Sequence, residues 1–450
     1  MTRKLSTAIL ATALIALAPS TPPPPAHSQP GAPPMPAHYA VAADPAKSPV
    51  APKRKPPADK SNTPAPDFRI RLDTVRSGFD KKTCWVHARA AVIPGPTPNV
   101  VMTLQKLLLT GSDVFYAINE MRTDDLGTTW SEPTAHEQTL GRRDEPAGVV
   151  VAACDWTPKW HAASRTLLGI GQTVRYRNNR VMTVRNRETA YAVYDQNEHK
   201  WSPWTTLKMP DEQRFKNAGA GSVQRYDLPN GDILLPIYFK QPKDKQYSVT
   251  VLRCSFDGRI LRYLLHGSEH SVPIDRGLCE PSLTRFKNRY YLTLRNDRAG
   301  YVTSSDDGLN YVEPRKWRFD DGQDLGNYNT QQHWVTHSDA LFLVYTRKAR
   351  GNDHVFRHRA PLFIARIDTE RLCVIRDTER ILVPERGARL GNFGVTPVNP
   401  RETWVTVTEW MQTKGPNPYD YRIPMKYGSD NAVFAARILW NTPNRLAPSN

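Results

Sequence analysis

The sequence predicts an all-β protein of six similar units arranged as a six-bladed β-propeller. Helix signals are scarce after residue 66, and short alternating or apolar runs recur between turn residues. The candidate first strands of successive units begin about 50 to 72 residues apart, a spacing typical of propeller blades with three or four strands each. Radial repetition also protects the strand edges that one large sheet would expose. A pair of elongated sandwiches is the structural alternative.

The first residues have the pattern of a secretory signal peptide. Arg3 and Lys4 precede an apolar stretch over 5–18, which is too short to span a bilayer. Small residues around 16–18 and 26–28 could each supply the cleavage site. We expect a signal peptide over residues 1–28 and a secreted or periplasmic protein.

The next segment, 29–66, is expected to be a disordered linker. The stretch 19–66 holds 16 of the 39 Pro residues and few large apolar side chains. Such a composition cannot bury enough surface to offset the loss of chain entropy on folding. The propeller domain is therefore predicted to occupy residues 67–450.

The predicted strands follow one another along the rest of the chain. Candidate first strands of the six units begin near His87, Ala147, Gly219, Glu280, Thr330 and Asn392. Further strands are expected over 100–108, 114–121, 148–153, 166–170, 190–194, 233–239, 248–253, 290–294, 340–345, 362–367, 403–409 and 432–439. Residues 67–80 are expected to complete a sheet with a strand from the other end of the chain.

The formal net charge of +17 favours an anionic partner. Residues 1–66 account for +5 of it, so the body carries about +12. Nucleic acid is disfavoured because no RRM, OB or helix-turn-helix signature accompanies the charge and a secretory signal is present. No other apolar run is long enough for a membrane span. An acidic glycan or polysaccharide is the expected partner, and nothing in the sequence indicates an oligomeric state.

The five cysteines are expected to be structural, and an oxidising compartment makes one or two disulfides possible. Their odd number leaves at least one without a partner in the chain. No CxxC or Cys/His spacing suggests zinc, so no metal or cofactor is expected. The cysteines are Cys84, Cys154, Cys254, Cys279 and Cys373.

A turn motif recurs after candidate third strands. Residues 123–130 and 304–311 both fit the Asp-box pattern [S/T]-x-D-x-G-x-x-[W/F/Y], while 254–258 and 195–201 are shortened or degenerate forms. In such a turn the Asp accepts hydrogen bonds from backbone N–H groups, the Gly takes a positive φ, and the aromatic residue packs beneath. This chemistry stabilises a hairpin, so the motif indicates a fold and not catalysis.

With these boxes the body resembles the Asp-box (BNR repeat) sialidase superfamily of six-bladed propellers, over roughly residues 84–440. The strand around Arg89 is similar to the Arg-Ile-Pro strand of sialidases. The order Cys279-Glu280-Pro281, then Tyr290 to Arg295, then the second box is similar to the family's Glu strand, Arg strand and box.

The resemblance implies a secreted exo-α-sialidase-like hydrolase acting on a terminal acidic sugar. Three arginines hold the substrate carboxylate in sialidases, because a planar guanidinium binds a carboxylate bidentately. Arg89 and Arg295 match the first two, and Arg357 or Arg359 matches the third. His87, two residues before Arg89, is a further candidate for substrate binding.

Glu280 resembles the glutamate that activates the nucleophile, and Asp113 stands near the position of the loop acid/base. The family nucleophile is a Tyr, but the matching strand here begins Gly391-Asn392-Phe393. Tyr419, Tyr421 or Tyr427 would have to reach in from a neighbouring loop. The missing Tyr favours two alternatives, a polysaccharide lyase and a glycan-binding propeller without catalysis.

The lyase alternative uses a different set of residues. Uronate lyases, including ulvan lyases, also use propellers. β-Elimination needs a cation to neutralise the uronate and a His or Tyr to move the proton. His161, Tyr238 and Arg253 are the candidates for these roles.

Overall fold

The computed structural model describes residues 66–110, 113–184, 186–211 and 213–448. They belong to one compact unit, Thr63–Asn450. The expected signal peptide and nearly all of the expected linker lie outside the described residues. Helices in these residues are few and short, the two α-helices being α1 (Glu137–Leu140) and α2 (Arg422–Lys426). The all-β prediction is confirmed for the described part of the chain.

The described strands form six antiparallel sheets, three of them in the first half of the chain. The first sheet contains β2 (Thr83–Ile93), β3 (Asn99–Leu108), β4 (Phe115–Thr123) and β5 (Thr134–Ala135). The second contains β6 (Arg143–Glu145), β7 (Val149–His161), β8 (Thr166–Arg177), β9 (Arg180–Val181), β10 (Thr189–Asp195), β11 (Lys200–Trp201) and β12 (Thr205–Thr206). The third contains β13 (Ala218–Gly219), β14 (Tyr226–Asp227), β15 (Ile233–Phe239), β16 (Ser248–Phe256) and β17 (Leu261–His266).

The other three sheets follow in chain order. The fourth contains β18 (Cys279–Phe286), β19 (Arg289–Arg295), β20 (Gly300–Ser305) and β21 (Arg315–Lys316). The fifth contains β22 (His333–Thr336), β23 (Leu341–Tyr345), β24 (Leu362–Asp368), β25 (Cys373–Val374) and β26 (Arg380–Val383). The sixth contains β27 (Gly394–Asn399), β28 (Glu402–Thr408), β29 (Val433–Trp440) and β1 (Phe68–Arg76). Every strand that the sequence predicts overlaps one of these.

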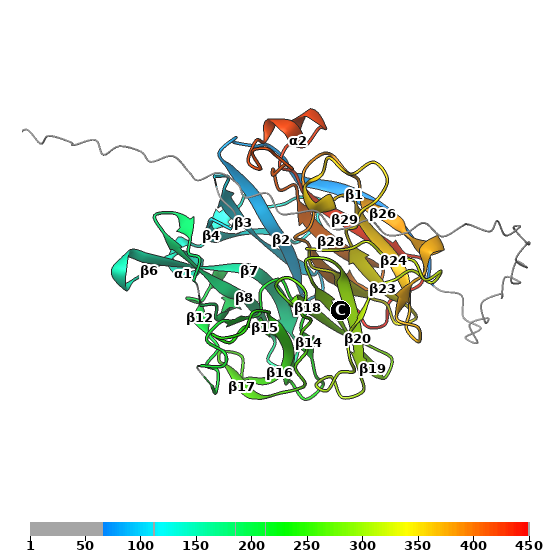
Figure 1. The fold of residues 1–450 in the computed structure, drawn as a ribbon, viewed down its shortest axis with the longest axis horizontal. Helices are drawn as coiled ribbons and strands as arrows, with labels where there is room; N and C mark the ends of the chain where they lie inside the picture. The colour runs from blue at the N-terminus through cyan, green and yellow to red at the C-terminus, as the bar shows by residue number, and fades with distance from the viewer. Residues whose placement is uncertain (1–65, 111–112, 185, 212, 449–450) are drawn as a thin grey trace, which may run out of the picture. The chain divides into compact units, whose positions relative to one another are not determined.

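The sheets follow one another around a closed ring. β2 contacts β7 and β27, β13 contacts β8 and β10, β15 contacts β18, and β22 contacts both β18 and β27. The chain ends close the sixth sheet, because β1 pairs antiparallel with β29 from Phe68 opposite Trp440 to Arg76 opposite Val433. Figure 1 shows this pair, with β1 in blue beside β29 in red. The prediction that residues 67–80 complete a sheet is confirmed.

The hydrophobic core lies between the faces of neighbouring sheets. Val101 of the first sheet packs with Val151 and Leu167 of the second, and Val344 of the fifth packs with Phe434 of the sixth. Each fully buried side chain of this size contributes about 1.5–3 kcal/mol to the stability of the fold. The same packing continues around the ring and holds the inner strands at its axis.

The Asp-box turns have the geometry that the sequence predicts. In the first, Thr129 N–H and Thr123 Oγ1–H donate to Asp125, Gly127 takes φ 80°, and Trp130 packs on Trp404. Hydrogen bonds from the backbone N–H of Thr129 lower the pKa of Asp125 to about 2.

The second turn differs in one detail. The acceptor there is Asp307, which the backbone N–H groups of Leu309 and Asn310 contact at 2.8 and 2.7 Å, and not Asp306 as the pattern's spacing implies. The turn is one residue tighter than the first, and Asp306 points outward.

The disulfides that an oxidising compartment would allow are not formed in this structure. All five cysteines are buried thiols, and no disulfide joins any two of them. They lie on five different strands, and burial raises the pKa of Cys84 to about 12, so its thiol is protonated and unreactive. In the described residues no helix combines the length and apolarity that a bilayer crossing requires.

Candidate functional site

A cavity of about 270 Å³ lies where the six sheets meet. We call it the axial cavity. Each sheet or its connections contributes lining residues, among them Asp113, Asp155, Tyr238, Glu280, Arg359 and Asn392. Because all six sheets contribute, the cavity lies at the axis of the ring.

Left-handed backbone recurs at the inner end of the sheets. Five residues without the freedom of glycine have positive φ there, at 58°, 53°, 57°, 44° and 52°: His87, Asp155, Ser222, Glu280 and Asn329. The strands β2, β7 and β18 carry register shifts at these positions. Each such residue costs on the order of 1–3 kcal/mol, and such strain clusters at functional sites. Three of the five side chains line the axial cavity as a result.

Three arginines converge on one oxygen in this cavity. Asn329 Oδ1 accepts hydrogen bonds from Arg295 Nη2 at 2.5 Å, Arg357 Nη1 at 3.4 Å and Arg359 Nη2 at 3.5 Å. Their nitrogen atoms therefore lie within a few ångströms of one another. The sequence left open whether Arg357 or Arg359 is the third arginine. Both lie here, with Arg359 buried and Arg357 exposed.

Acidic residues stand beside these arginines. Glu280 forms an ion pair with Arg295 Nη1. Asp297 pairs with Arg276 at 2.7 Å, and although burial alone would raise its pKa, hydrogen bonds from Arg276 hold that pKa below the usual value. Asp113 also lines the cavity, at φ 60° in the connection from β3 to β4. Both sequence-predicted acidic residues, Glu280 and Asp113, therefore share the cavity with the arginine cluster.

A fourth cavity arginine, Arg389, was not predicted. Its guanidinium lies 3.6 Å from the centre of the Trp410 ring and donates to Gln412 Oε1 at 2.5 Å. Burial, and then the charge of Arg357, lower the pKa of Arg389 to about 9. Burial and the charge of Arg389 likewise hold the pKa of Arg359 well below its usual value.

Several nitrogen atoms of this cluster lack acceptors. Within the described residues, the buried Nε atoms of Arg295, Arg359 and Arg389 have no hydrogen-bond partner. No carboxylate of the described chain lies within ion-pair distance of Arg357, Arg359 or Arg389. The cavity thus presents unsatisfied positive charge, as a site for an anion does.

The structure does not bring Arg89, which was predicted to bind the substrate, into the lining of the cavity with the other arginines. Arg89 does not line the axial cavity and is fully buried. Its nitrogens donate to acceptors on four other sheets: Phe393 O at 3.3 Å, Trp156 O at 3.1 Å, Ser222 Oγ at 2.7 Å and Gln331 Oε1 at 2.9 Å. Arg89 therefore ties the inner strands together and has no guanidinium edge available to a ligand.

His87, also predicted to bind the substrate, does not line the axial cavity either. Its ring is buried, with Nε2 2.8 Å from Asn392 Nδ2 and 3.3 Å from Asp155 Oδ1. Burial lowers the pKa of His87 to about 4, so the ring is neutral near pH 7. Burial alone would raise the pKa of Asp155, while His87 and Arg89 lower it below the usual range. His87 supports the cavity wall through Asn392.

The lyase set does not converge. Tyr238 lines the axial cavity, where its hydroxyl donates to Gln172 Oε1 at 2.7 Å. His161 is held by Ser164 Oγ at 2.7 Å and Gly231 O at 2.9 Å, and Arg253 pairs with Asp232 at 2.6 Å. His161 and Arg253 do not line the cavity, so they cannot act together with Tyr238 on a sugar bound there.

No tyrosine replaces the missing nucleophile from the loops that the sequence suggested. Tyr419 and Tyr421 pack against the hydrophobic cluster around Trp410, and Tyr427 stacks on His354 at 4.1 Å. Tyr238 is the tyrosine that lines the described cavity. Burial raises its pKa well above the usual value, so its hydroxyl stays protonated.

The segment from Gly391 to Gly394 instead seats two arginines. A Cβ on Gly391 would lie 2.5 Å from Arg359 Cδ, and one on Gly394 would lie 2.8 Å from Arg89 Cγ. Both glycines are therefore required for close approach. Asn329, Arg389 and Asn392 fit no sequence motif, so the sequence does not identify them as site residues. The two glycines are the signal that indicates close packing in the segment 391–394.

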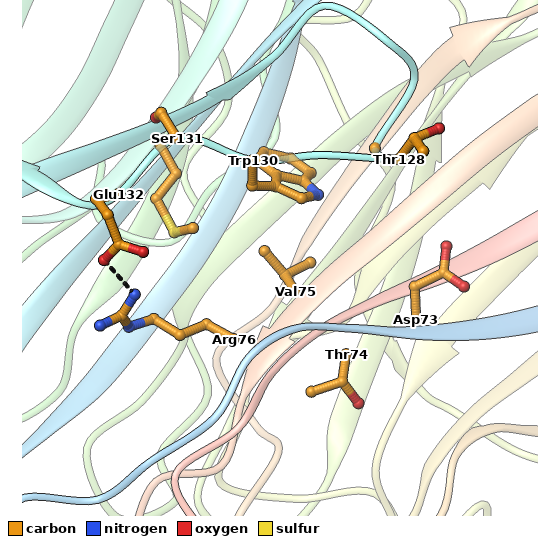
Figure 2. Close-up of a pocket in the computed structure, with 10 residues that line it drawn as sticks. Asp73, Thr74, Val75, Arg76, Thr128, Trp130, Ser131 and Glu132 are labelled. Atoms are coloured by element: carbon orange, nitrogen blue, oxygen red, sulfur yellow. Dashed lines mark hydrogen bonds and ion pairs between the residues drawn. The ribbon is translucent and has the colours of Figure 1, made fainter.

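A second, smaller hollow of about 170 Å³ lies between the first Asp-box turn and β1. Figure 2 shows Trp130 and Val75 within it and the ion pair between Arg76 and Glu132, at 2.6 Å, across one side. Its arginine already has a carboxylate partner. This hollow belongs to the packing of the turn and offers no comparable cluster of charges.

No known family model matches this chain. No curated protein matches it by sequence. Solved structures do match: a protein of unknown function from Dyadobacter fermentans DSM 18053 has a TM-score of 0.53 and 12% identity, over 82% of this chain and 99% of that one.

Two sialidases match similarly. Hadza microbial sialidase Hz136 has a TM-score of 0.54 and 12% identity, over 81% of this chain and 68% of that one. Trypanosoma rangeli sialidase has a TM-score of 0.52 and 12% identity over 83% of this chain, which spans 60% of that sialidase. At this identity the similarity establishes the fold, which is a sialidase-like β-propeller.

Proposed function

We propose that this protein holds one terminal acidic sugar of a glycan in the axial cavity and hydrolyses the bond that joins it to the glycan. The observation that carries the proposal is the convergence of Arg295, Arg357 and Arg359 on Asn329 Oδ1 beside Glu280. Guanidinium groups bind a carboxylate bidentately, so this cluster suits the carboxylate of an acidic sugar. A cavity of about 270 Å³ is near the lower end of ligand-site volumes and suits one sugar unit.

In the proposed reaction water is the nucleophile. Asp113 donates a proton to the leaving glycosidic oxygen while Glu280 accepts a proton from the water, whose oxygen bonds to the anomeric carbon. Tyr238 is a poor nucleophile, because its pKa is raised and its hydroxyl faces an amide oxygen and not a base. Single displacement by water inverts the configuration at the anomeric carbon.

Binding without catalysis is the second candidate function. The observation that favours it is the ion pair between Glu280 and Arg295, which occupies an oxygen of the proposed base. A bound sugar carboxylate would compete for Arg295 and release Glu280 in the hydrolase, whereas in a binding protein the ion pair would persist.

We also propose that the six sheets are six blades of one domain over residues 67–450, with a cleaved signal peptide over 1–28 and a linker over 29–66. The closed ring of sheets supports six blades. The apolar stretch at 5–18 and the Pro-rich segment after it support export to the periplasm or the exterior. Mass spectrometry of the exported chain would locate the cleavage site, and an intact Met1 would contradict this part of the proposal.

The reaction is tested by incubating the purified protein separately with sialosides and with uronate-containing glycans such as ulvan. We expect a free reducing sugar without a new double bond, and proton NMR of the first product should show the inverted anomer. An ultraviolet-absorbing unsaturated uronate would instead indicate a lyase. Calorimetric binding without any product would indicate the second candidate function.

A further inference from the structure

The charges of the axial cavity exceed what one carboxylate can neutralise. Two of its arginines are paired within the protein, Arg295 with Glu280 and Arg276 with Asp297. Arg357, Arg359 and Arg389 have no such partner in the described chain, although all three line the cavity. Even with Asp113, whose charge acts on Arg357 and Arg389, one bound carboxylate would leave net positive charge among these groups.

These arginines form two neighbouring centres. Arg295 and Arg359 meet at Asn329, whereas Arg389 lies flat on Trp410 and turns one edge to Gln412. Its Nε is buried and has no acceptor among the described residues.

Arg357 lies between these two centres. Its guanidinium and that of Arg389 both face the ring of Phe356, at 4.9 and 5.4 Å from its centre. Arg357 also donates to Asn329 at the other centre. It can therefore turn to either centre when a ligand binds.

We infer that the sugar in the axial cavity carries two anionic groups. A carboxylate contacts Arg295 and Arg359, and a second oxyanion on the same sugar unit, such as a sulfate ester, contacts Arg389 and Arg357. This inference rests on the proposed function and narrows it to sulfated or otherwise doubly acidic terminal sugars. The planar donors of Arg389 suit a sulfate oxygen pair, and stacking on Trp410 fixes their direction.

The lowered pKa values agree with this arrangement. Burial and Arg357 bring the pKa of Arg389 to about 9, and burial and Arg389 lower that of Arg359. Two ligand anions placed between these groups would oppose both effects. Binding of a doubly charged sugar should therefore depend more steeply on salt concentration than binding of a singly charged one.

The experiment compares ligand pairs by calorimetry at fixed ionic strength. The probes are a methyl glucuronide, its monosulfated form, a di-uronate and inorganic sulfate. We expect the sulfated sugar to bind the wild-type protein about 10- to 100-fold tighter than the unsulfated one. R389Q should reduce this ratio to near one, while the control R253Q, outside the cavity, should preserve it.

Equal binding of the two sugars by the wild-type protein would overturn the inference and leave the proposed function standing. A preference only for the di-uronate would overturn the placement of the second group on the same sugar. Binding of neither sugar would overturn both proposals. If R389Q does not fold, as judged by circular dichroism, the ratio of the wild-type affinities for the sulfated and the unsulfated sugar still tests the inference.

Discussion

Two buried arginines near the axis, Arg89 and Arg359, differ in what their nitrogens contact. Both are almost inaccessible, at 0% and 3% exposure, and each is packed against a glycine of the segment 391–394. Arg89 gives its donors to acceptors on four other sheets. Arg359 contacts Asn329 and Asn392 and keeps a buried Nε that has no acceptor among the described residues. Burial of an arginine therefore does not identify a binding residue, whereas an unused donor on an arginine that lines the cavity supports that role.

The charges around the two arginines differ in the same way. Burial lowers the pKa of Arg89, but Asp155 and Glu280 oppose that effect. Burial also lowers the pKa of Arg359, and the positive charges of Arg389 and Arg295 add to that effect, so the pKa lies well below its usual value. Carboxylates of the protein therefore favour the charged form of Arg89, whereas a bound anion would do so for Arg359.

The largest expected effect is on catalysis. Glu280→Gln keeps the shape of the side chain and removes the proposed base, so turnover should fall about 10²- to 10⁴-fold. Kinetics on the substrate found in the reaction test would measure this loss. Asp232→Asn removes a carboxylate that pairs with Arg253 outside the cavity and should leave turnover unchanged. Full activity of the Glu280 variant would remove that residue from the site.

The next effect is on stability. Arg89→Met removes the hydrogen bonds of Arg89 to four other sheets and the buried cation that lowers the pKa of Asp155, although Phe393 O still accepts from Gln331 Nε2. The free energy of unfolding should fall by about 3–5 kcal/mol, as when one partner of a buried charge network is removed. Urea unfolding would measure it, with Arg253→Met as the surface control. A loss comparable to that of the control would show that Arg89 does not hold the sheets together.

A pH effect follows from His87. Its pKa in the folded protein is about 4, below the ordinary 6.5, because burial disfavours the charged ring. The folded state therefore binds fewer protons than the unfolded state between those values. Stability is fully present above about pH 6.5 and falls as the pH drops toward 4, by on the order of 3 kcal/mol.

This pH effect can be assigned by mutation. The pKa of His333 is also lowered by burial and contributes in the same direction. His87→Gln should flatten the stability curve over this pH range, as measured by unfolding at several pH values. An unchanged curve would contradict the assignment to His87.

Much of the fold was predictable from the sequence, because alternating strands and Asp-box turns are local patterns. The turns that end at Trp130 and Tyr311, for example, are held by hydrogen bonds from neighbouring backbone N–H groups to Asp125 and Asp307. Glu280 and Arg295 were also predictable, since they belong to adjacent strands of one hairpin.

The remaining features of the site depend on long-range contacts. Arg89 has the same local pattern as a binding arginine, but its guanidinium donates to acceptors from four other sheets, which the local sequence does not indicate. Arg389 and Asn329 enter the site only because the ring brings connections from separate sheets together. Gly391, two residues after Arg389, indicates close packing there but does not identify the arginine, and no such signal accompanies Asn329.

The most direct test of the account is Arg359→Gln, measured for both affinity and stability. We predict that the affinity for the acidic sugar found in the binding experiment falls about 10- to 100-fold, because a charge-assisted hydrogen bond to its carboxylate is lost. The free energy of unfolding should change by less than about 1 kcal/mol, because the loss of hydrogen bonds is offset by relief of repulsion from Arg389. Unchanged affinity together with a stability loss as large as that of Arg89→Met would contradict the account, since Arg359 would then join the sheets as Arg89 does.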